Sequence, residues 1–191
     1  MTGVQTCALP ISTRDALLPQ DGLYTVAVRD RGGERLQVIG AIRDVLVAPE
    51  DPDALIAVMS QPSVRIVTLT VTEKGYCHDP ATGTLNERHP DIVHDLAHHS
   101  AFDAGLAHHA RPRSAPGFLI AALARRRAAG IAPFTVLCCD NLPANGRTVH
   151  RVLIRLASLI DPVFGTFVQD HVACPCTMVD RIVPADRKSV V

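Results

Sequence analysis

VRIVTLTV, residues 64–71, decides the fold, because this run is apolar or β-branched on both of its alternating faces. A strand of this kind is buried on both sides, which is typical of the interior of a parallel sheet. A second such run, FTVLCC, occupies residues 134–139. Between the two, residues 116–129 (PGFLIAALARRRAA) have the apolar spacing of an amphipathic helix that ends at Gly130. The order strand, helix, strand predicts a βαβ crossover within an open, mostly parallel sheet.

Further elements on either side fit the same α/β architecture. Two strand-like runs, residues 22–28 and 36–42, flank the pair Gly32-Gly33 and predict a β-hairpin. The spacing of apolar residues and the position of prolines predict four more helices, at residues 51–59, 90–99, 146–160 and 162–171. Strands that alternate with helices of this length indicate one α/β domain with helices flanking its sheet.

The composition excludes several classes of partner. The chain has 191 residues, with 47% hydrophobic and 20% charged residues, as in ordinary soluble globular proteins. Nineteen basic residues balance nineteen acidic ones, so no net charge attracts the chain to nucleic acid or to a membrane surface. No apolar run approaches the roughly 20 residues of a membrane span. We therefore expect no nucleic-acid or membrane partner and, without a signal peptide, a cytoplasmic protein with reduced thiols.

The two ends of the chain differ from the rest. Residues 1–12, MTGVQTCALPIS, resemble the conceptual translation of a sequencing adapter, and residues 186–191, DRKSVV, resemble read-through of the companion adapter. Segments of that origin carry no information about the fold. We therefore expect the natural domain to span residues 13–185 and both ends to make few tertiary contacts. A natural but unusual pair of termini is the alternative.

Polar side chains follow the two buried runs, where ligands bind in open α/β sheets. Thr72 and Glu73 follow the first run, and Asp140, Asn141 and Asn145 follow the second. Because neighbouring parallel strands end at the same edge of a sheet, we expect these side chains to lie close together. A dinucleotide and its substrate could meet at this edge.

Four blocks of sequence resemble consecutive motifs of the mannitol dehydrogenase family, the long-chain polyol dehydrogenases and fructuronate reductases. They are TVTEKGYC (residues 70–77), PDIVHDLAH (90–98), FTVLCCDNLPANG (134–146) and MVDRIVP (178–184). The resemblance covers nearly all of residues 13–185, in order and in spacing. It implies a Rossmann-like nucleotide-binding domain, incomplete at both ends, from an NAD-dependent oxidoreductase that acts on CH–OH groups.

The resemblance also implies roles for single residues. Asn141 matches the family asparagine that holds the substrate oxygen in an oxyanion hole, and Glu73 matches a glutamate linked to proton movement. Asp180 matches a polar position near the nicotinamide, although a salt bridge with Arg181 would explain it as well. The cofactor-binding residues that we expect are Thr72, Asp140, Asn145 and Asp180. The expected cofactor is NAD, with NADP left open, and the expected substrate is a small polyol or sugar acid, such as mannitol or mannonate.

The parts that the family requires for catalysis fall outside these residues. Its glycine-rich phosphate loop would precede Thr13, and its catalytic lysine would follow Ala185. Lys74 and Lys188 are the only lysines in the chain, and neither lies in the block that carries the catalytic one. We therefore expect the chain to be inactive by itself.

Simpler explanations exist for the same side chains. Asp140 and Asn141 could form a turn in which the side chains bond to their own backbone. Glu73 beside Lys74 could form a solvent-facing ion pair, worth about 0–1 kcal/mol. A non-enzymatic nucleotide-binding or interaction domain is the alternative to an enzyme fragment.

A structural metal site is a further alternative. His94 and His98 are four residues apart on a predicted helix, which places two imidazoles on one face, and Cys174 and Cys176 add sulfur ligands. The chain has no C-x-x-C pair, however, and solvated histidines are the simpler explanation. The resembling family also moves its proton with a lysine rather than with zinc. We therefore expect no metal.

Overall fold

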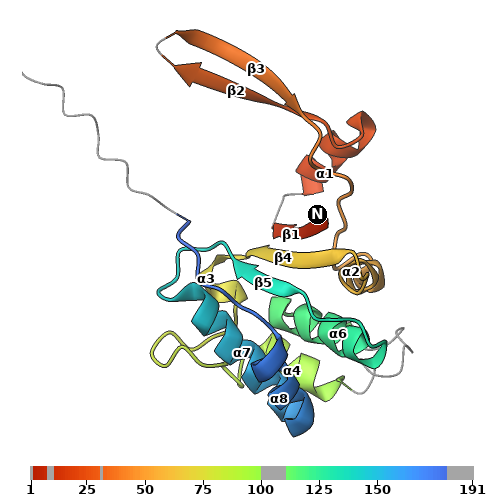
Figure 1. Ribbon diagram of the computed structural model, residues 1–191, viewed down its shortest axis with the longest axis vertical. Coiled ribbons are helices and arrows are strands. Elements are labelled where there is room, and N and C mark those ends of the chain that lie inside the picture. Colours follow the sequence, from red (N-terminus) through yellow and green to blue (C-terminus); the bar gives the residue numbers. More distant parts are fainter. Residues whose placement is uncertain (1, 8–10, 31, 100–110, 180–191) are drawn as a thin grey trace, which may run out of the picture. The chain divides into compact units, whose positions relative to one another are not determined.

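The computed structural model describes residues 2–7, 11–30, 32–99 and 111–179 (Figure 1). The chain divides into two compact units, which are described separately below. One unit comprises Met1–Cys7 and Ile56–Val191, and the other comprises Ala8–Leu55. No helix among the described residues is long and apolar enough to cross a membrane.

A three-stranded parallel sheet forms the centre of the larger unit. Its strands lie in the order β1 (Thr2–Cys7), β4 (Val64–Thr70) and β5 (Thr135–Cys138). The central strand β4 pairs in parallel with β5, from Ile66 opposite Thr135 to Leu69 opposite Cys138. The prediction that the two apolar runs form neighbouring parallel strands is confirmed.

Helices cover this sheet and carry most of the core. Among the described residues, the helices that follow the hairpin are α2 (Pro52–Met59), α3 (Thr72–Gly75), α4 (Pro90–Ala97), α6 (Ala115–Ala128), α7 (Asn145–Ile160) and α8 (Pro162–His171). Figure 1 shows α4, α6, α7 and α8 on the same side of β4 and β5, and α7 packs against the other three. The fully buried side chains of these helices include Leu119, Ile120, Leu123, Leu153 and Leu156. The predicted α/β class is therefore confirmed.

Strand β1 corrects one expectation. Residues Gly3–Cys7 pair in parallel with Ile66–Thr70 of β4, so the prediction of few tertiary contacts for residues 1–12 is wrong for this segment. The physical reason is that the free edge of a sheet offers backbone groups that any extended segment can satisfy, whatever its side chains. β1 lies at the edge of the sheet and not at its centre. The origin of residues 1–12 stays a prediction, and residues 186–191 lie outside the described part of the chain.

The smaller unit contains the predicted hairpin. It begins with α1 (Ile11–Leu17) and the short 3-10 helix η1 (Leu18–Gln20), followed by β2 (Tyr24–Asp30) and β3 (Gly33–Ile39). The two strands are antiparallel, with Tyr24 opposite Ile39 and Asp30 opposite Gly33. Gly22 has a φ of +72°, and a Cβ atom there would collide with the carbonyl oxygen of Ile42. Glycine is therefore required where the chain enters the hairpin.

A buried arginine ties several elements of the larger unit together. Arg126 of α6 is 2% exposed. Its Nη1 donates to the carbonyl oxygens of Met59 (3.0 Å), Gln61 (2.7 Å) and Val64 (3.1 Å), and its Nε donates to that of Ala132 (2.8 Å). These carbonyls belong to the end of α2, the entry to β4 and the loop before β5. One guanidinium group therefore fixes where β4 begins relative to α6.

We expect Arg126→Met to lower the free energy of unfolding by about 3 kcal/mol or more, because buried carbonyl groups lose their donor. Denaturant unfolding followed by circular dichroism measures this change. The matched control is Arg125→Met, since Arg125 is the preceding residue on α6 and is exposed. That control should change the free energy by about 0.5 kcal/mol or less. Equal effects of the two substitutions would mean that the hydrogen bonds of Arg126 do not hold the unit together.

Candidate functional site

The carboxyl ends of β4 and β5 lie side by side, and a helix begins shortly after each. Helix α3 begins at Thr72, two residues beyond the end of β4, and α7 begins at Asn145, seven residues beyond the end of β5. Figure 1 shows the starts of both helices near these strand ends. Glu73 and Asn141, which follow different strands, are thereby brought to the same edge of the sheet, as predicted.

The carboxylate of Asp140 joins the two strand ends. Its Oδ2 accepts a hydrogen bond from the backbone N–H of Val71 (2.9 Å) and another from the hydroxyl of Tyr76 (2.5 Å). Val71 directly precedes α3 and Tyr76 directly follows it. One side chain therefore fixes both ends of α3 against the end of β5. These partners lie 69 and 64 residues away in sequence, so the Asp140 carboxylate is not bonded to its own turn, although the backbone N–H of Leu142 does donate to the Asp140 carbonyl oxygen (2.9 Å).

Tyr76 is the buried member of this arrangement. It is 1% exposed, and its hydroxyl oxygen also accepts a hydrogen bond from the thiol of Cys138 (2.9 Å). Burial, followed by the hydrogen bond to Asp140, raises the pKa of Tyr76. The phenol therefore stays protonated at neutral pH and donates its hydrogen to Asp140. Tyr76 was not among the predicted site residues, although a tyrosine inside the block TVTEKGYC was a usable signal.

Asn145 is a second internal tie, between β5, α7 and the segment after α8. It is 2% exposed. Its Nδ2 donates to the carbonyl oxygens of Cys138 (3.3 Å), Asp140 (3.2 Å) and Thr177 (3.2 Å) and to the Thr177 hydroxyl (2.9 Å). Its Oδ1 accepts from the backbone N–H groups of Gly146 (2.8 Å) and Thr177 (3.0 Å). The side-chain amide of Asn145 thus makes all of these hydrogen bonds within the protein, and it holds the segments next to this edge of the sheet together.

Gly146 shows how closely the segment after α8 crosses the start of α7. A Cβ atom at Gly146 would collide with the carbonyl oxygens of Cys174 and Pro175. Any larger residue at this position would push the segment away from α7. Thr177, which holds the segment through Asn145, was also missed by the sequence analysis, because no local pattern marks it.

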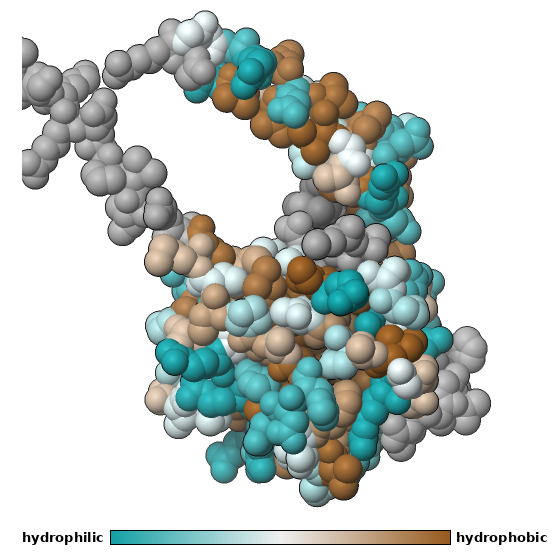
Figure 2. All heavy atoms as spheres, in the orientation of Figure 1, coloured by the Kyte–Doolittle hydropathy of each residue, from teal (hydrophilic) through white to brown (hydrophobic). Residues whose placement is uncertain are grey.

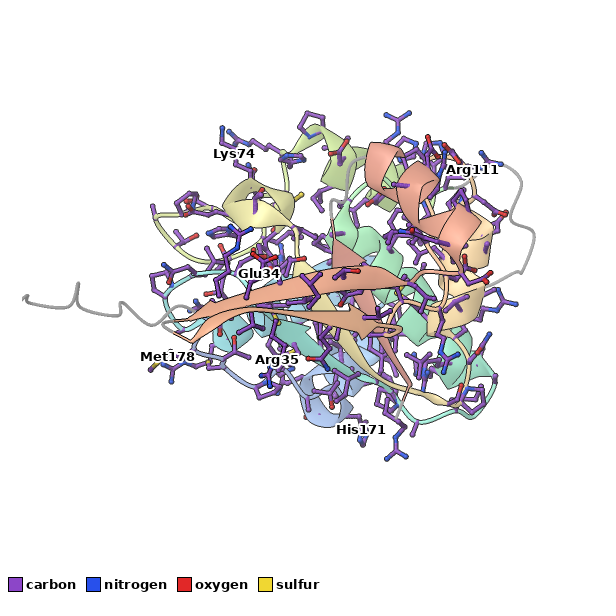
Figure 3. All side chains as sticks on the ribbon, turned by 90° about the horizontal axis from the view of Figure 1, so that it is seen from above. Glu34, Arg35, Lys74, Arg111, His171 and Met178 are labelled. Carbon is purple, nitrogen blue, oxygen red and sulfur yellow. The ribbon has the colours of Figure 1, made fainter. Side chains whose placement is uncertain are left out.

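Three predicted site residues, Thr72, Glu73 and Asn141, are exposed at this edge. Within the described part of the chain, the side chains of Glu73 and Asn141 have no hydrogen-bond or ion-pair partner, so the ion pair with Lys74 is not formed. Figure 3 shows Lys74 on the outside of the molecule. Thr72 has a φ of +66°, a left-handed conformation that is rare for a β-branched residue and that often occurs at functional sites. Asp180 lies outside the described residues.

The residues of the metal hypothesis do not assemble into a binding site in the described part of the chain. His94 and His98 stack with their ring centroids 4.3 Å apart, and the Nδ1 atom of His98 lies 2.8 Å from the carbonyl oxygen of His94. The described residues contain no group of three or more His, Cys, Asp or Glu side chains that could hold a metal ion. Burial, and then the nearby Cys138, raise the pKa of Cys174 to about 12. Cys174 is therefore a protonated thiol at neutral pH.

Two cavities formed by the described residues of the larger unit lie away from this edge. One of about 260 Å³ is lined by residues of α6 and α8 and by His99, and another of about 350 Å³ lies between α7 and the loop at residues 84–87. Neither is lined by the predicted site residues.

The sequence of the chain is similar to those of known proteins. A family model described as the mannitol dehydrogenase Rossmann domain matches residues 2–190. Mannitol 2-dehydrogenase of Cereibacter sphaeroides is 46% identical over 172 residues, which are 90% of this chain and 34% of that protein. Mannitol 2-dehydrogenase of Pyricularia oryzae is 43% identical, over 91% of this chain and 33% of that protein.

Two solved structures are similar as well. The ternary complex of Pseudomonas fluorescens mannitol 2-dehydrogenase with NAD and D-mannitol is 41% identical, with a TM-score of 0.78, over 90% of this chain and 33% of that one. A substrate-free D-sorbitol dehydrogenase is 32% identical, with a TM-score of 0.79, over 92% of this chain and 34% of that one. The chain therefore spans about a third of the length of these relatives.

We expect Tyr76→Phe to lower the free energy of unfolding by about 1.5–3 kcal/mol, the usual contribution of a hydrogen bond to a charged group. The substitution removes the bond to Asp140 and also the acceptor of the Cys138 thiol, and denaturant unfolding measures the loss. Tyr24→Phe is the matched control, because Tyr24 is the other tyrosine of the chain and its hydroxyl has no hydrogen-bond partner among the described residues. If both variants have the same free energy of unfolding as the unsubstituted chain, Tyr76 does not fix the strand ends.

Proposed function

Because this chain belongs to the mannitol dehydrogenase family, we propose that it forms part of the nucleotide-binding domain of an NAD-dependent polyol dehydrogenase. The reaction is the reversible transfer of a hydride between nicotinamide and a secondary carbinol. The names of the relatives support this proposal, since three are mannitol 2-dehydrogenases and one of these was solved with NAD and D-mannitol. A mannitol–fructose pair and a mannonate–fructuronate pair are the proposed substrate types.

The tie between the ends of β4 and β5 is the observation that carries the proposal. Open α/β sheets bind ligands at the carboxyl ends of their strands. Here Asp140 holds two such ends together, and Glu73 and Asn141 lie exposed on the segments that it joins. These two exposed side chains are therefore accessible to a ligand at the edge where such sheets bind one.

Some residues at this edge are proposed to contact a dinucleotide directly, and others to shape its binding site. NAD, when bound, supplies the carbon that accepts or donates the hydride. Thr72, exposed and in a left-handed conformation, is proposed to contact the cofactor directly, and so is Asp180. Asp140 and Asn145 are proposed to shape the cofactor site from beneath, because their polar atoms are engaged with the protein itself.

Asn141 and Glu73 are proposed to act on the substrate side. The amide N–H of Asn141 donates to the carbinol oxygen as negative charge develops on it, and an oxyanion donor of this kind lowers the barrier most when it is held in place beforehand. Its neighbour Asp140 provides that restraint. Glu73, on the exposed surface of α3, passes the proton between the site and solvent. The family resemblance assigns the base itself to a lysine beyond Ala185.

We expect the 191-residue chain to show no mannitol- or fructose-dependent turnover with NAD or NADH, and weak cofactor binding at best. The parent protein, meaning the longer polypeptide of the source gene that contains residues 13–185, should be active. The reason is that the phosphate loop and the general base that the family resemblance implies are both supplied by the longer polypeptide, and a positioned base alone contributes about 10²–10⁴-fold. Absorbance at 340 nm follows both reactions. Turnover by the short chain would refute the fragment proposal, and a parent protein that binds NAD but turns over no polyol would indicate a binding domain instead.

In the parent protein we expect Asn141→Ala to lower kcat by about 10²–10³-fold, which is the usual effect of losing one oxyanion donor. Steady-state kinetics with mannitol and fructose measure the change. Asn86→Ala is the matched control, because Asn86 is also exposed but lies in the loop before α4. The control should retain kcat within about twofold. Near-normal kcat for Asn141→Ala would remove this residue from the mechanism.

A further inference from the structure

Asn141, the proposed oxyanion donor, is an exposed side chain on a backbone that is held on both sides. The Leu142 N–H donates to the carbonyl oxygen of Asp140 (2.9 Å), which also accepts from Nδ2 of Asn145 (3.2 Å). Leu142 itself is 8% exposed and therefore buried, whereas Asn141 is exposed. The direction in which the Asn141 amide points thus depends on how firmly its neighbours are held.

The side chain of Asp140 is held by two donors at one oxygen. Its Oδ2 accepts from the Val71 N–H (2.9 Å) and from the Tyr76 hydroxyl (2.5 Å). Both distances are short, as expected for hydrogen bonds to a charged acceptor. A carboxylate with a single donor can pivot about that hydrogen bond, whereas two donors fix its orientation. Removal of the Tyr76 hydroxyl would take away one of these two restraints.

A buried thiol orients the Tyr76 hydroxyl in turn. Cys138, which is fully buried, donates to the hydroxyl oxygen (2.9 Å). Because this oxygen accepts from Cys138, the hydroxyl hydrogen is directed at Asp140. The three groups form one series of hydrogen bonds, which runs from β5 through the end of α3 to the residue before Asn141.

Tyr76 cannot touch a ligand itself, because it is 1% exposed. Figure 2 shows the outer atoms of the larger unit, where hydrophilic and hydrophobic residues are mixed. A side chain as buried as Tyr76 contributes almost nothing to such a surface. Any effect of Tyr76 on a reaction must therefore pass through the residues that it holds.

We propose that Tyr76 is a positioning residue for hydride transfer, because its hydroxyl holds Asp140 and thereby the backbone that directs Asn141 at the carbinol oxygen. This proposal rests on the proposed function, since it takes Asn141 as the oxyanion donor. Such a donor lowers the barrier most when it is held in place before the reaction. Supporting hydrogen bonds are what keep a reacting group within about 0.5 Å of its productive position. Without the Tyr76 hydroxyl, the Asn141 amide is still present but is less well oriented.

The test is the steady-state kinetics of Tyr76→Phe in the parent protein, with NAD and either mannitol or mannonate. The phenyl ring keeps the packing of the buried side chain and loses only the hydroxyl. We expect kcat to fall by about tenfold, because a displacement of about 1 Å can cost up to about 10²-fold and the Val71 N–H still holds Asp140. The KM values should stay within about twofold, since Tyr76 reaches neither substrate nor cofactor. Unchanged kcat, or a change in KM alone, would overturn the proposal.

A double-mutant cycle separates the positioning of Asn141 from a general loosening of the edge. In an Asn141→Ala background, Tyr76→Phe should lower kcat by no more than about twofold, because no amide is left to orient. In a Glu73→Gln background, it should still lower kcat by about tenfold. Equal losses in the two backgrounds would contradict the positioning of Asn141, and so would a loss that disappears only when Glu73 is replaced.

Cys138→Ala is a milder second variant, because it removes the donor that orients the Tyr76 hydroxyl. We expect it to lower kcat by about three- to fivefold with KM unchanged. Circular dichroism at the assay temperature shows whether each variant is folded. If Tyr76→Phe does not fold, Cys138→Ala decides alone, and normal kcat in that variant would overturn the proposal.

Ser60→Ala is the matched control, since it also removes one buried hydroxyl but at the other end of β4. Ser60 is 8% exposed and donates its hydroxyl hydrogen to the carbonyl oxygen of Ile56 (2.7 Å). This control should keep kcat within about twofold. A loss as large as that of Tyr76→Phe would mean that any buried hydroxyl lowers turnover through stability, and the positioning role would fall.

The single variant Asn141→Ala tells the two proposals apart. Near-normal kcat in Asn141→Ala, or a parent protein without polyol turnover, would refute the proposed function, and the positioning role would fall with it. A large loss in Asn141→Ala together with normal kcat in Tyr76→Phe would refute the positioning role alone and leave the proposed function intact.

Discussion

The site depends on one carboxylate, that of Asp140, which accepts hydrogen bonds from the Val71 N–H and the Tyr76 hydroxyl. The backbone hydrogen bonds between β4 and β5 end with the Cys139 N–H, which donates to the carbonyl oxygen of Leu69 (2.8 Å). Beyond that point nothing in the ladder fixes where the chain goes. The side chain of Asp140 connects the two segments one residue beyond the sheet. The next residue, Asn141, is exposed to solvent. Adjacent residues thus divide two tasks, with one holding the edge and the next available to a ligand.

Strand β4 is held in a comparable way at its other end. Arg126 donates to the carbonyl oxygen of Val64, the first residue of β4, and to those of Met59 and Gln61 just before it. A buried guanidinium group with several carbonyl acceptors and a buried phenol beside a carboxylate are costly to desolvate unless their geometry is satisfied. A shift of β4 by one residue would break the hydrogen bonds at both of its ends and leave these buried groups without partners. The desolvation cost therefore favours a single register of β4. A strand fixed at both ends places its following residues, Thr72 and Glu73, reproducibly.

Sequence patterns predicted the elements well and the side-chain partners poorly. VRIVTLTV was identified as a central parallel strand because its two apolar faces are a property of the segment alone, and proline at the starts of α4 and α8 marked where each helix begins. The partners of Asp140 lie more than 60 residues away, so no local pattern reveals that Asp140 turns inward while Asn141 turns outward. The pairing of β1 with β4 was missed for a related reason, since backbone groups make that contact and every sequence has them.

The two units also differ in how completely they bury their own apolar surface, and the residues proposed for chemistry lie on the unit that buries more of it. The larger unit has fully buried leucines on α6 and α7, and charged or polar ties at the edges of its sheet. The hairpin of the smaller unit keeps four large aliphatic side chains exposed on two faces. The residues proposed for chemistry thus lie on a framework whose core is formed within this chain.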